Sequence, residues 1–200
     1  MTAFYPICKI TLLSLCCLFF MSHMARADWI LDKENSNLSF GSIKNNTIGE
    51  SNYFNEIDGR VTGNGEISLL IELNSIETWV DIRNDRMKTF FFETDDFPLA
   101  QLRGQIDMTK FAKLGLGSQQ IIEVAFDLSL HGHQQTVETE LVVIRVSQEK
   151  IIVVPNEIIF LDLEEFDLLS GLKKLQELAK LPIISSSVPI TFNLTFLQIP

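Results

Sequence analysis

After residue 27 the sequence contains no cysteine, because Cys8, Cys16 and Cys17 all precede that point. This part of the chain therefore has no disulfide, no thiol nucleophile and no thiolate metal site. It also lacks the motifs of common catalytic centres: no G-x-S-x-G, no phosphate-binding P-loop, no dinucleotide-binding fingerprint and no H-E-x-x-H. These absences argue against most classes of enzyme.

Basic residues are also few. Without Lys9 and Arg26 the 16 basic residues fall to 14 against 26 acidic ones, a formal charge of −12. Nucleic acids and anionic membranes both favour basic proteins. We therefore expect no nucleic-acid partner and at most transient membrane contact. A homodimer is compatible with the sequence.

The first 27 residues have the pattern of a cleavable signal peptide. Lys9 precedes an apolar run over residues 10–21, and Ala25 and Ala27 are the small residues that a signal peptidase reads. The run is short for a stable membrane span, so an uncleaved anchor is the less favoured alternative. We predict cleavage after Ala27 and a periplasmic protein whose single domain covers residues 28–200.

The rest of the chain alternates apolar and polar residues, which is the period of half-buried β-strands. Three segments show it most clearly, over residues 66–73, 122–130 and 188–196. Turn residues separate such segments at Asn45-Asn46, Asp58-Gly59, 63–65 and Gly132. The pattern predicts an all-β antiparallel protein, either a sandwich or a barrel.

Two segments have helical spacing instead. Residues 83–92 place Met87, Phe90 and Phe91 at i, i+3 and i+4, with Phe92 expected at the rim of that face. Residues 168–181 place Leu168, Leu172, Leu175 and Ala179 on one stripe, and Pro182 ends the helix. We predict that this late helix packs its leucines against the sheet.

Several short motifs together resemble the YceI-like family of exported, lipocalin-like proteins. They are Trp29-x-x-Asp32, Ser36-x-Leu38-x-Phe40, Phe54-x-x-Ile57-x-Gly59, Ser75-Ile76-x-Thr78 followed by Arg83 and Met87, then Phe97-Pro98 and Leu130-His131-Gly132. The resemblance implies an antiparallel, extended lipocalin-like β-barrel around an apolar tunnel, with a short helix after the fourth or fifth strand and a helix before the last strand. It also implies non-catalytic binding of isoprenoid chains, such as quinones or polyprenyl lipids, without a cofactor.

The sequence departs from the family pattern at four places, one of which is the turn over residues 131–135, where the family usually has a Val-Thr-rich form. Asn84 stands where the family usually has aspartate, and Asn52 replaces a common glycine. The predicted helix over residues 168–181 occupies a connection that is shorter in the family.

The resemblance and the apolar faces together suggest the site residues. The chain has fifteen phenylalanines, twelve of them after residue 27. We predict that Phe40, Phe54, Phe126 and Phe192 form the tunnel wall, and that Met87, Phe90 and Phe91 form a lid over one mouth. The protein would sequester or transport an apolar, chain-like ligand such as an isoprenoid, a quinone or another lipid.

Three other interpretations stay open at this point. The phenylalanines could fill the barrel rather than line a tunnel, since periodicity does not separate the two. The late helix could instead dock on a protein partner or a membrane face. His131 and His133 could bind a metal with Glu138, but they flank Gly132 in a predicted turn, so we expect no metal.

Overall fold

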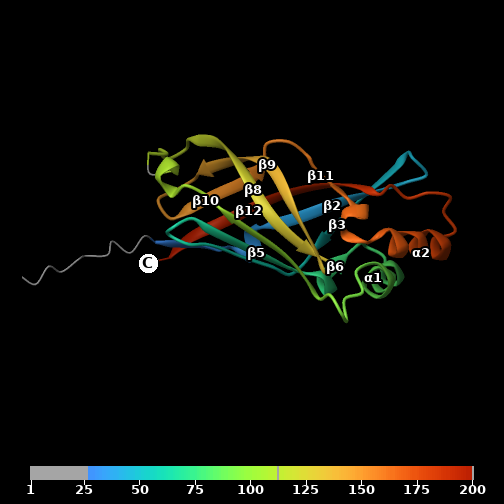
Figure 1. The fold of residues 1–200 in the computed structure, drawn as a ribbon. Helices are drawn as coiled ribbons and strands as arrows, with labels where there is room; N and C mark the ends of the chain where they lie inside the picture. The colour runs from blue at the N-terminus through green and yellow to red at the C-terminus, as the bar shows by residue number, and fades with distance from the viewer. Residues whose placement is uncertain (1–26, 112, 200) are drawn as a thin grey trace, which may run out of the picture.

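A computed structural model describes residues 27–111 and 113–199 and shows an antiparallel β-barrel (Figure 1). The predicted signal peptide, apart from Ala27, lies outside the described residues. The strands are β1 (Asp28–Leu31), β2 (Asn37–Lys44), β3 (Ile48–Phe54), β4 (Ile57–Val61), β5 (Glu66–Glu72), β6 (Ile76–Glu77), β7 (Leu99–Gln105), β8 (Gln119–Leu130), β9 (His133–Arg145), β10 (Lys150–Pro155), β11 (Ile159–Asp162) and β12 (Ser187–Ile199). The helices are α1 (Asp81–Arg86), a π-helix (Met87–Phe91) and α2 (Leu169–Ala179), with short 3₁₀ turns at Lys33–Asn35, Leu73–Ser75, Met108–Phe111 and Leu163–Phe166.

Eight strands close the barrel in the order β1-β4-β5-β7-β8-β9-β10-β12, because β12 pairs with β1. The same strand β12 continues beyond this ring, where it pairs with β2 and β11. Three of the long strands are therefore interrupted along their length: β1 continues as β2, β3 as β4, and β10 as β11. All pairings are antiparallel, so the predicted fold class is confirmed.

The three segments with the clearest alternation are β5, β8 and β12, and their apolar residues face the inside of the barrel. Asn45 and Asn46 form the β2–β3 turn with positive φ angles of 51° and 60°. The predicted turn at Asp58-Gly59 is wrong, since both residues lie within β4. A side chain at Gly59 would come within 3.1 Å of Leu69 and 3.3 Å of Leu31, so the glycine makes room inside the barrel.

Both α-helices lie at one end of the barrel, which we call the helical end (Figure 1). The start of β1, the end of β12 and the 3₁₀ turn at Met108–Phe111 lie at the other end. Within the part of the chain that the structure describes, no helix is both long and apolar enough to cross a bilayer.

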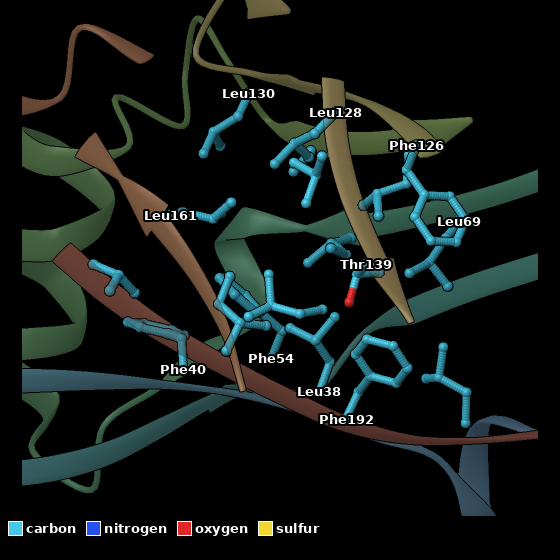
Figure 2. A pocket seen from close by; sticks show the side chains of 18 of the residues that line it. Leu38, Phe40, Phe54, Leu69, Phe126, Leu128, Leu130, Thr139, Leu161 and Phe192 are labelled. Carbon is cyan, nitrogen blue, oxygen red and sulfur yellow. The ribbon is translucent and has the colours of Figure 1, made fainter. Parts of the chain in front are cut away.

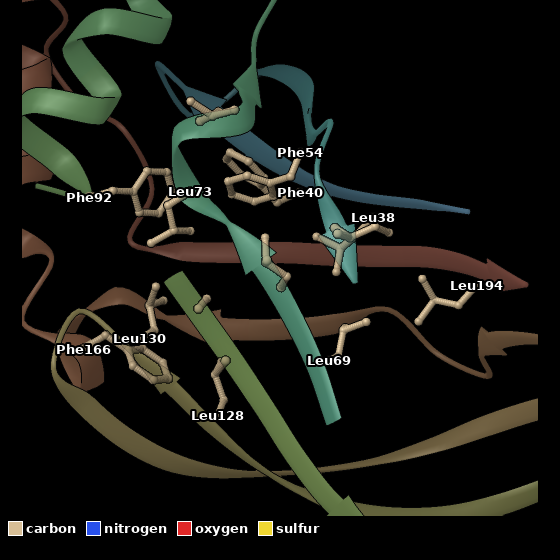
Figure 3. Packing of buried hydrophobic residues seen from close by; sticks show 14 of the residues in the cluster. Leu38, Phe40, Phe54, Leu69, Leu73, Phe92, Leu128, Leu130, Phe166 and Leu194 are labelled. Carbon is tan, nitrogen blue, oxygen red and sulfur yellow. The ribbon is translucent and has the colours of Figure 1, made fainter. Parts of the chain in front are cut away.

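The buried apolar residues form one main cluster that runs through the barrel (Figure 3). At the helical end it contains a chain of aromatic rings. The ring centroids of Phe40 and Phe54 are 5.4 Å apart, those of Phe54 and Phe92 5.8 Å, and those of Phe91 and Phe92 4.7 Å. Aromatic contacts of this kind add stabilisation beyond the burial of area alone.

The short predicted helix has a different register from the one that we expected. α1 ends at Arg86, and the chain continues as a π-helix in which the Phe92 amide donates to the Met87 carbonyl, five residues earlier (2.9 Å). This wider turn places Phe91 and Phe92 on the same side as Met87. Both rings are 5% exposed, whereas Phe90 faces outward and is 39% exposed. The predicted positions of Phe90, in the lid, and Phe92, at the rim, are therefore wrong.

The late helix packs as predicted. Leu168 and Leu172 are buried and Leu175 is partly buried against the same core. Gly171 lets α2 approach the π-helix closely, since a side chain there would lie 2.4 Å from the Phe90 carbonyl oxygen. The leucine stripe is covered by the barrel, so it is not free to dock on a partner.

Candidate functional site

The inside of the barrel holds a cavity of about 340 Å³. All eight strands of the closed ring contribute side chains to its wall, and α1, the π-helix and α2 contribute at the helical end. Figure 2 shows leucine and phenylalanine side chains that point into this space from opposite strands. Small-molecule sites of this kind are concave and mostly apolar, so the cavity is the candidate functional site.

All four predicted wall residues line the cavity. Phe40 comes from β2, Phe54 from β3, Phe126 from β8 and Phe192 from β12 (Figure 2). They share the wall with many aliphatic side chains from these and the other strands of the barrel. These include Leu38, Leu69, Leu102, Leu128, Leu141, Val153 and Leu194.

The predicted lid residues do not all reach the cavity. Met87 and Phe91 line it, whereas Phe90 does not. Phe92 lines it instead, because of the π-helical turn. Leu168, Leu172 and Leu175 of the late helix region also contribute, so two packed helical segments cover this end of the cavity.

Charged side chains of the wall lie towards its two ends. Lys44, Arg83 and Arg86 lie at the helical end, and Arg145 lies near the β9–β10 turn, where its guanidinium donates to the Leu114 carbonyl (3.4 Å). Along the wall between them, Thr139 places a hydroxyl among apolar side chains (Figure 2). Strand alternation did not identify these residues as part of the site, because their grouping depends on contacts between distant segments.

Glu50 of β3 connects two of the cations at the helical end. Its carboxylate forms salt bridges with both Lys44 and Arg83. Partial burial raises the pKa of Glu50, but the Lys44 and Arg83 contacts outweigh this and hold the pKa below its ordinary value of 4.5. The carboxylate is therefore ionised at neutral pH and joins α1 to the β2–β3 hairpin.

A buried polar network fixes the chain where it enters α1. The Asn84 side-chain oxygen accepts from the Thr78 amide (2.9 Å) and hydroxyl (2.6 Å), while the Asn84 amide donates to the Glu77 carboxylate (3.0 Å). Hydrogen bonds from Asn84 and from the Trp79 backbone lower the pKa of Glu77. An ionised aspartate at position 84 could not donate to Glu77, so the asparagine fits this arrangement.

His131 lies in the β8–β9 turn with a positive φ of 51°. Its Nδ1 is 3.2 Å from the Phe166 carbonyl oxygen and its Nε2 is 3.0 Å from the Glu93 carboxylate. The two ring nitrogens thus contact protein groups from two other segments, whereas His133 is exposed. Within residues 27–111 and 113–199, no three His, Asp or Glu side chains gather where they could hold a metal ion.

Comparisons with known proteins support this description of the fold. A family model described as "YceI-like domain" matches residues 29–196. A polyisoprenoid binding domain from Saccharophagus degradans, implicated in plant cell wall breakdown, is 32% identical, with a TM-score of 0.84 over 86% of this chain and 98% of that one. Burkholderia cenocepacia BcnA is 17% identical, with a TM-score of 0.66 over 82% and 98% of the two chains, and so shows a similar fold. The search of curated proteins found no match.

Proposed function

The chain belongs to the family of YceI-like domains, and from this premise we propose that its barrel binds an isoprenoid chain without chemical conversion. The observation that carries the proposal is the apolar cavity, which extends along the barrel from the helical end towards Arg145. The Saccharophagus degradans domain, described as polyisoprenoid binding, supports it further.

The wall suits a long, apolar and unbranched or methyl-branched molecule. Burial of such a ligand contributes about 25 cal/mol per Å² of apolar area, less the cost of association. Phenylalanine rings at Phe40, Phe54 and Phe192 offer flat surfaces to alkene and methyl groups. The cavity wall has few polar groups, and no two of them are arranged as a nucleophile beside a general base. We therefore infer a binding protein rather than an enzyme.

We further infer that the protein sequesters or carries its ligand outside the cytoplasm. The support is the sequence before Asp28, which has the pattern of a cleavable signal peptide. N-terminal sequencing of exported protein should then begin at Asp28.

Mass spectrometry of an organic extract from natively expressed protein tests the proposal directly. We expect an isoprenoid lipid in roughly one copy per chain, as for a cavity that takes one slender ligand. An extract that contains only a mixture of membrane phospholipids would contradict the proposal.

A pair of variants on β7 tests whether the cavity is the binding site. Ala100 faces the cavity and Gln101 faces away from it. Ala100→Phe should fill part of the cavity and lower isoprenoid binding at least about tenfold, a change of about 1.4 kcal/mol. Gln101→Phe adds the same ring outside the barrel and should leave binding unchanged.

A further inference from the structure

The charged side chains that line the cavity are all of one sign. They are Lys44, Arg83, Arg86 and Arg145, and no aspartate or glutamate of the described residues lines the wall. The chain as a whole is acidic, with 26 acidic residues against 16 basic ones. The acidic residues of α1, α2 and the segments beside them are exposed and lie outside the wall: Asp81, Asp85, Glu93, Asp95, Asp96, Glu164, Glu165, Asp167 and Glu177. The positive charge therefore belongs to the cavity and not to the surface around it.

Three of the four cations lie together at the helical end. Lys44 and Arg83 share the carboxylate of Glu50. Arg83 and Arg86 are three residues apart on α1, so they lie on the same side of the helix, and Arg86 donates to the Leu178 carbonyl (3.3 Å). The carboxylate of Glu50 offsets one of the three positive charges, which leaves a net charge of +2.

The guanidinium of Arg83 has a donor that the fold does not use. Its Nη1 donates to Glu50, and its Nη2 donates to the Thr78 carbonyl (2.5 Å). Its Nε is buried and has no hydrogen-bond partner within residues 27–111 and 113–199. A buried donor without a partner is costly, so it is rare outside sites that receive a ligand or water. An acceptor oxygen at the cavity wall would satisfy this donor.

The fourth cation, at the opposite end, is engaged by the fold itself. All three guanidinium nitrogens of Arg145 donate to backbone carbonyls, those of Ser147 (3.3 Å), Leu114 (3.4 Å) and Gln148 (3.4 Å). Leu114 and Phe111 also line the cavity at this end. The end near Arg145 therefore suits the apolar part of a ligand, whereas the helical end suits a charged part.

We propose that Lys44, Arg83 and Arg86 bind a phosphate head group, so that the ligand is an isoprenoid phosphate or diphosphate whose chain runs towards Arg145. A phosphate monoester carries a charge of about −1.5 to −2 at neutral pH, which complements the local charge of the cluster. Arginine binds phosphate oxygens through paired N–H groups, and such bonds are strong where apolar walls exclude water. The inference rests on the proposed isoprenoid binding and adds the head group and its position.

Two ligands with the same chain and different head groups test the proposal. Geranylgeranyl phosphate should bind the wild type at least about tenfold more tightly than geranylgeraniol. Equal affinities would overturn the head-group proposal and leave the proposed function standing. If neither ligand binds, both proposals fail. Inorganic phosphate that binds as tightly as geranylgeranyl phosphate would also overturn the head-group proposal, since the cluster would then be a site for the free anion.

Charge-removing variants test which residues hold the head group. In Arg86→Gln the preference for the phosphate over the alcohol should fall at least about tenfold, because a charge-assisted hydrogen bond is lost. Lys173→Gln removes the same charge from an exposed position of α2 outside the cavity and should keep the preference of the wild type. Equal falls in the two variants would overturn the proposal, since the general charge of the protein would then explain them.

Arg83→Lys is the second variant, which decides the question even if Arg86→Gln does not fold. It keeps the positive charge at position 83 but removes the unpartnered Nε donor. The preference for geranylgeranyl phosphate over geranylgeraniol should fall here as well. A folded Arg83→Lys protein with the preference of the wild type would overturn the role of the Arg83 guanidinium in the proposal.

A nitroxide label tests the orientation of the ligand. The sequence has no cysteine after residue 27, so exported protein whose N-terminus is confirmed as Asp28 can take a single label. Thr89, on the π-helix, and Gln148, in the β9–β10 turn, are both exposed. A label on Thr89→Cys should broaden the phosphorus NMR signal of bound geranylgeranyl phosphate more than a label on Gln148→Cys. The reverse order would overturn the proposed orientation.

The lipid that the protein carries after native expression gives the most direct test. Negative-ion mass spectrometry of an organic extract should detect an isoprenoid that bears phosphate. A neutral quinone or a free prenyl alcohol as the bound lipid would overturn the head-group proposal, while the proposal that the barrel binds an isoprenoid would stand.

Discussion

Gly171 of α2 lies against the backbone of Phe90, at a distance that no side chain could occupy. A Cβ atom at position 171 would be 2.4 Å from the Phe90 carbonyl oxygen and 2.8 Å from the Phe91 Cα. Because both contacts are with backbone, neither neighbour can rotate away. The two helical segments that cover the cavity are therefore joined through a glycine.

This contact predicts the outcome of Gly171→Ala. In an exposed helix the change would stabilise by about 1 kcal/mol through helix propensity. Here we expect the free energy of unfolding to fall by about 1–3 kcal/mol instead, because α2 must move away from the π-helix. Urea unfolding measures the change. Ser170→Ala, at the exposed neighbouring position, should be neutral or stabilising, and equal effects of the two variants would contradict the prediction.

Phe91→Ala should affect ligand release more than stability. Loss of a phenylalanine ring from a fully packed core costs about 3–5 kcal/mol. Phe91 borders an existing cavity, so we expect a smaller loss, together with release of bound isoprenoid at least about tenfold faster. Stopped-flow release and urea unfolding measure the two effects, with Phe90→Ala as the outward-facing control. If the free energy of unfolding fell by the full amount expected for a packed core and the release rate did not change, Phe91 would stabilise the core without controlling ligand release.

The salt bridges of Glu50 predict a dependence of stability on pH. The folded-state pKa of Glu50 lies below its ordinary value of 4.5, so its contribution to stability is complete above that value. The contribution is lost as the pH falls through the folded-state pKa. The wild type should therefore be more stable than Glu50→Gln at neutral pH, and the difference should shrink as the pH falls from about 6 to about 3. A difference that does not change over this range would refute the prediction, and Glu157→Gln, in an exposed turn, serves as the control.

His131→Asn should remove the side-chain contacts that connect the β8–β9 turn to Phe166 and Glu93. Asparagine tolerates the positive φ at this position, so the substitution tests the side chain rather than the backbone. Loss of the contacts with Phe166 and Glu93 should lower the free energy of unfolding by about 1–2 kcal/mol. Hydrogen exchange should become faster at Glu93 and its neighbours. His133→Asn, at an exposed strand position, should change neither measurement.

The alternating segments of the sequence predicted most of the fold. Ile67, Leu69 and Ile71 face the cavity because one face of a strand in a closed barrel is always enclosed. The predicted turn at Asp58-Gly59 was wrong, since Gly59 is a turn residue by composition but a space-making residue inside the barrel by position. Local pattern does not separate these two roles.

The candidate site was predicted in part. Phe40, Phe54, Phe126 and Phe192 line the cavity because they lie on the apolar faces of strands. Phe90 was misplaced because the π-helix shifts the register by one residue, and nothing in the residues 87–92 distinguishes it from an α-helix. The grouping of Lys44, Glu50 and Arg83 was not predicted, since it requires the hairpin and α1 to meet in space.

The position of β12 determines when the barrel closes around the cavity. If only the eight ring strands are considered, seven of the eight pairings join strands that are successive in chain order, and the eighth joins the first, β1, to the last, β12. β12 also pairs with β2, β10 and β11, so no order of assembly encloses the cavity before the thirteen residues of β12 are in place. Without β12, the other seven strands of the ring would be a curved sheet with two free edges, so the pairing of β12 with β1 and β10 is what encloses the cavity.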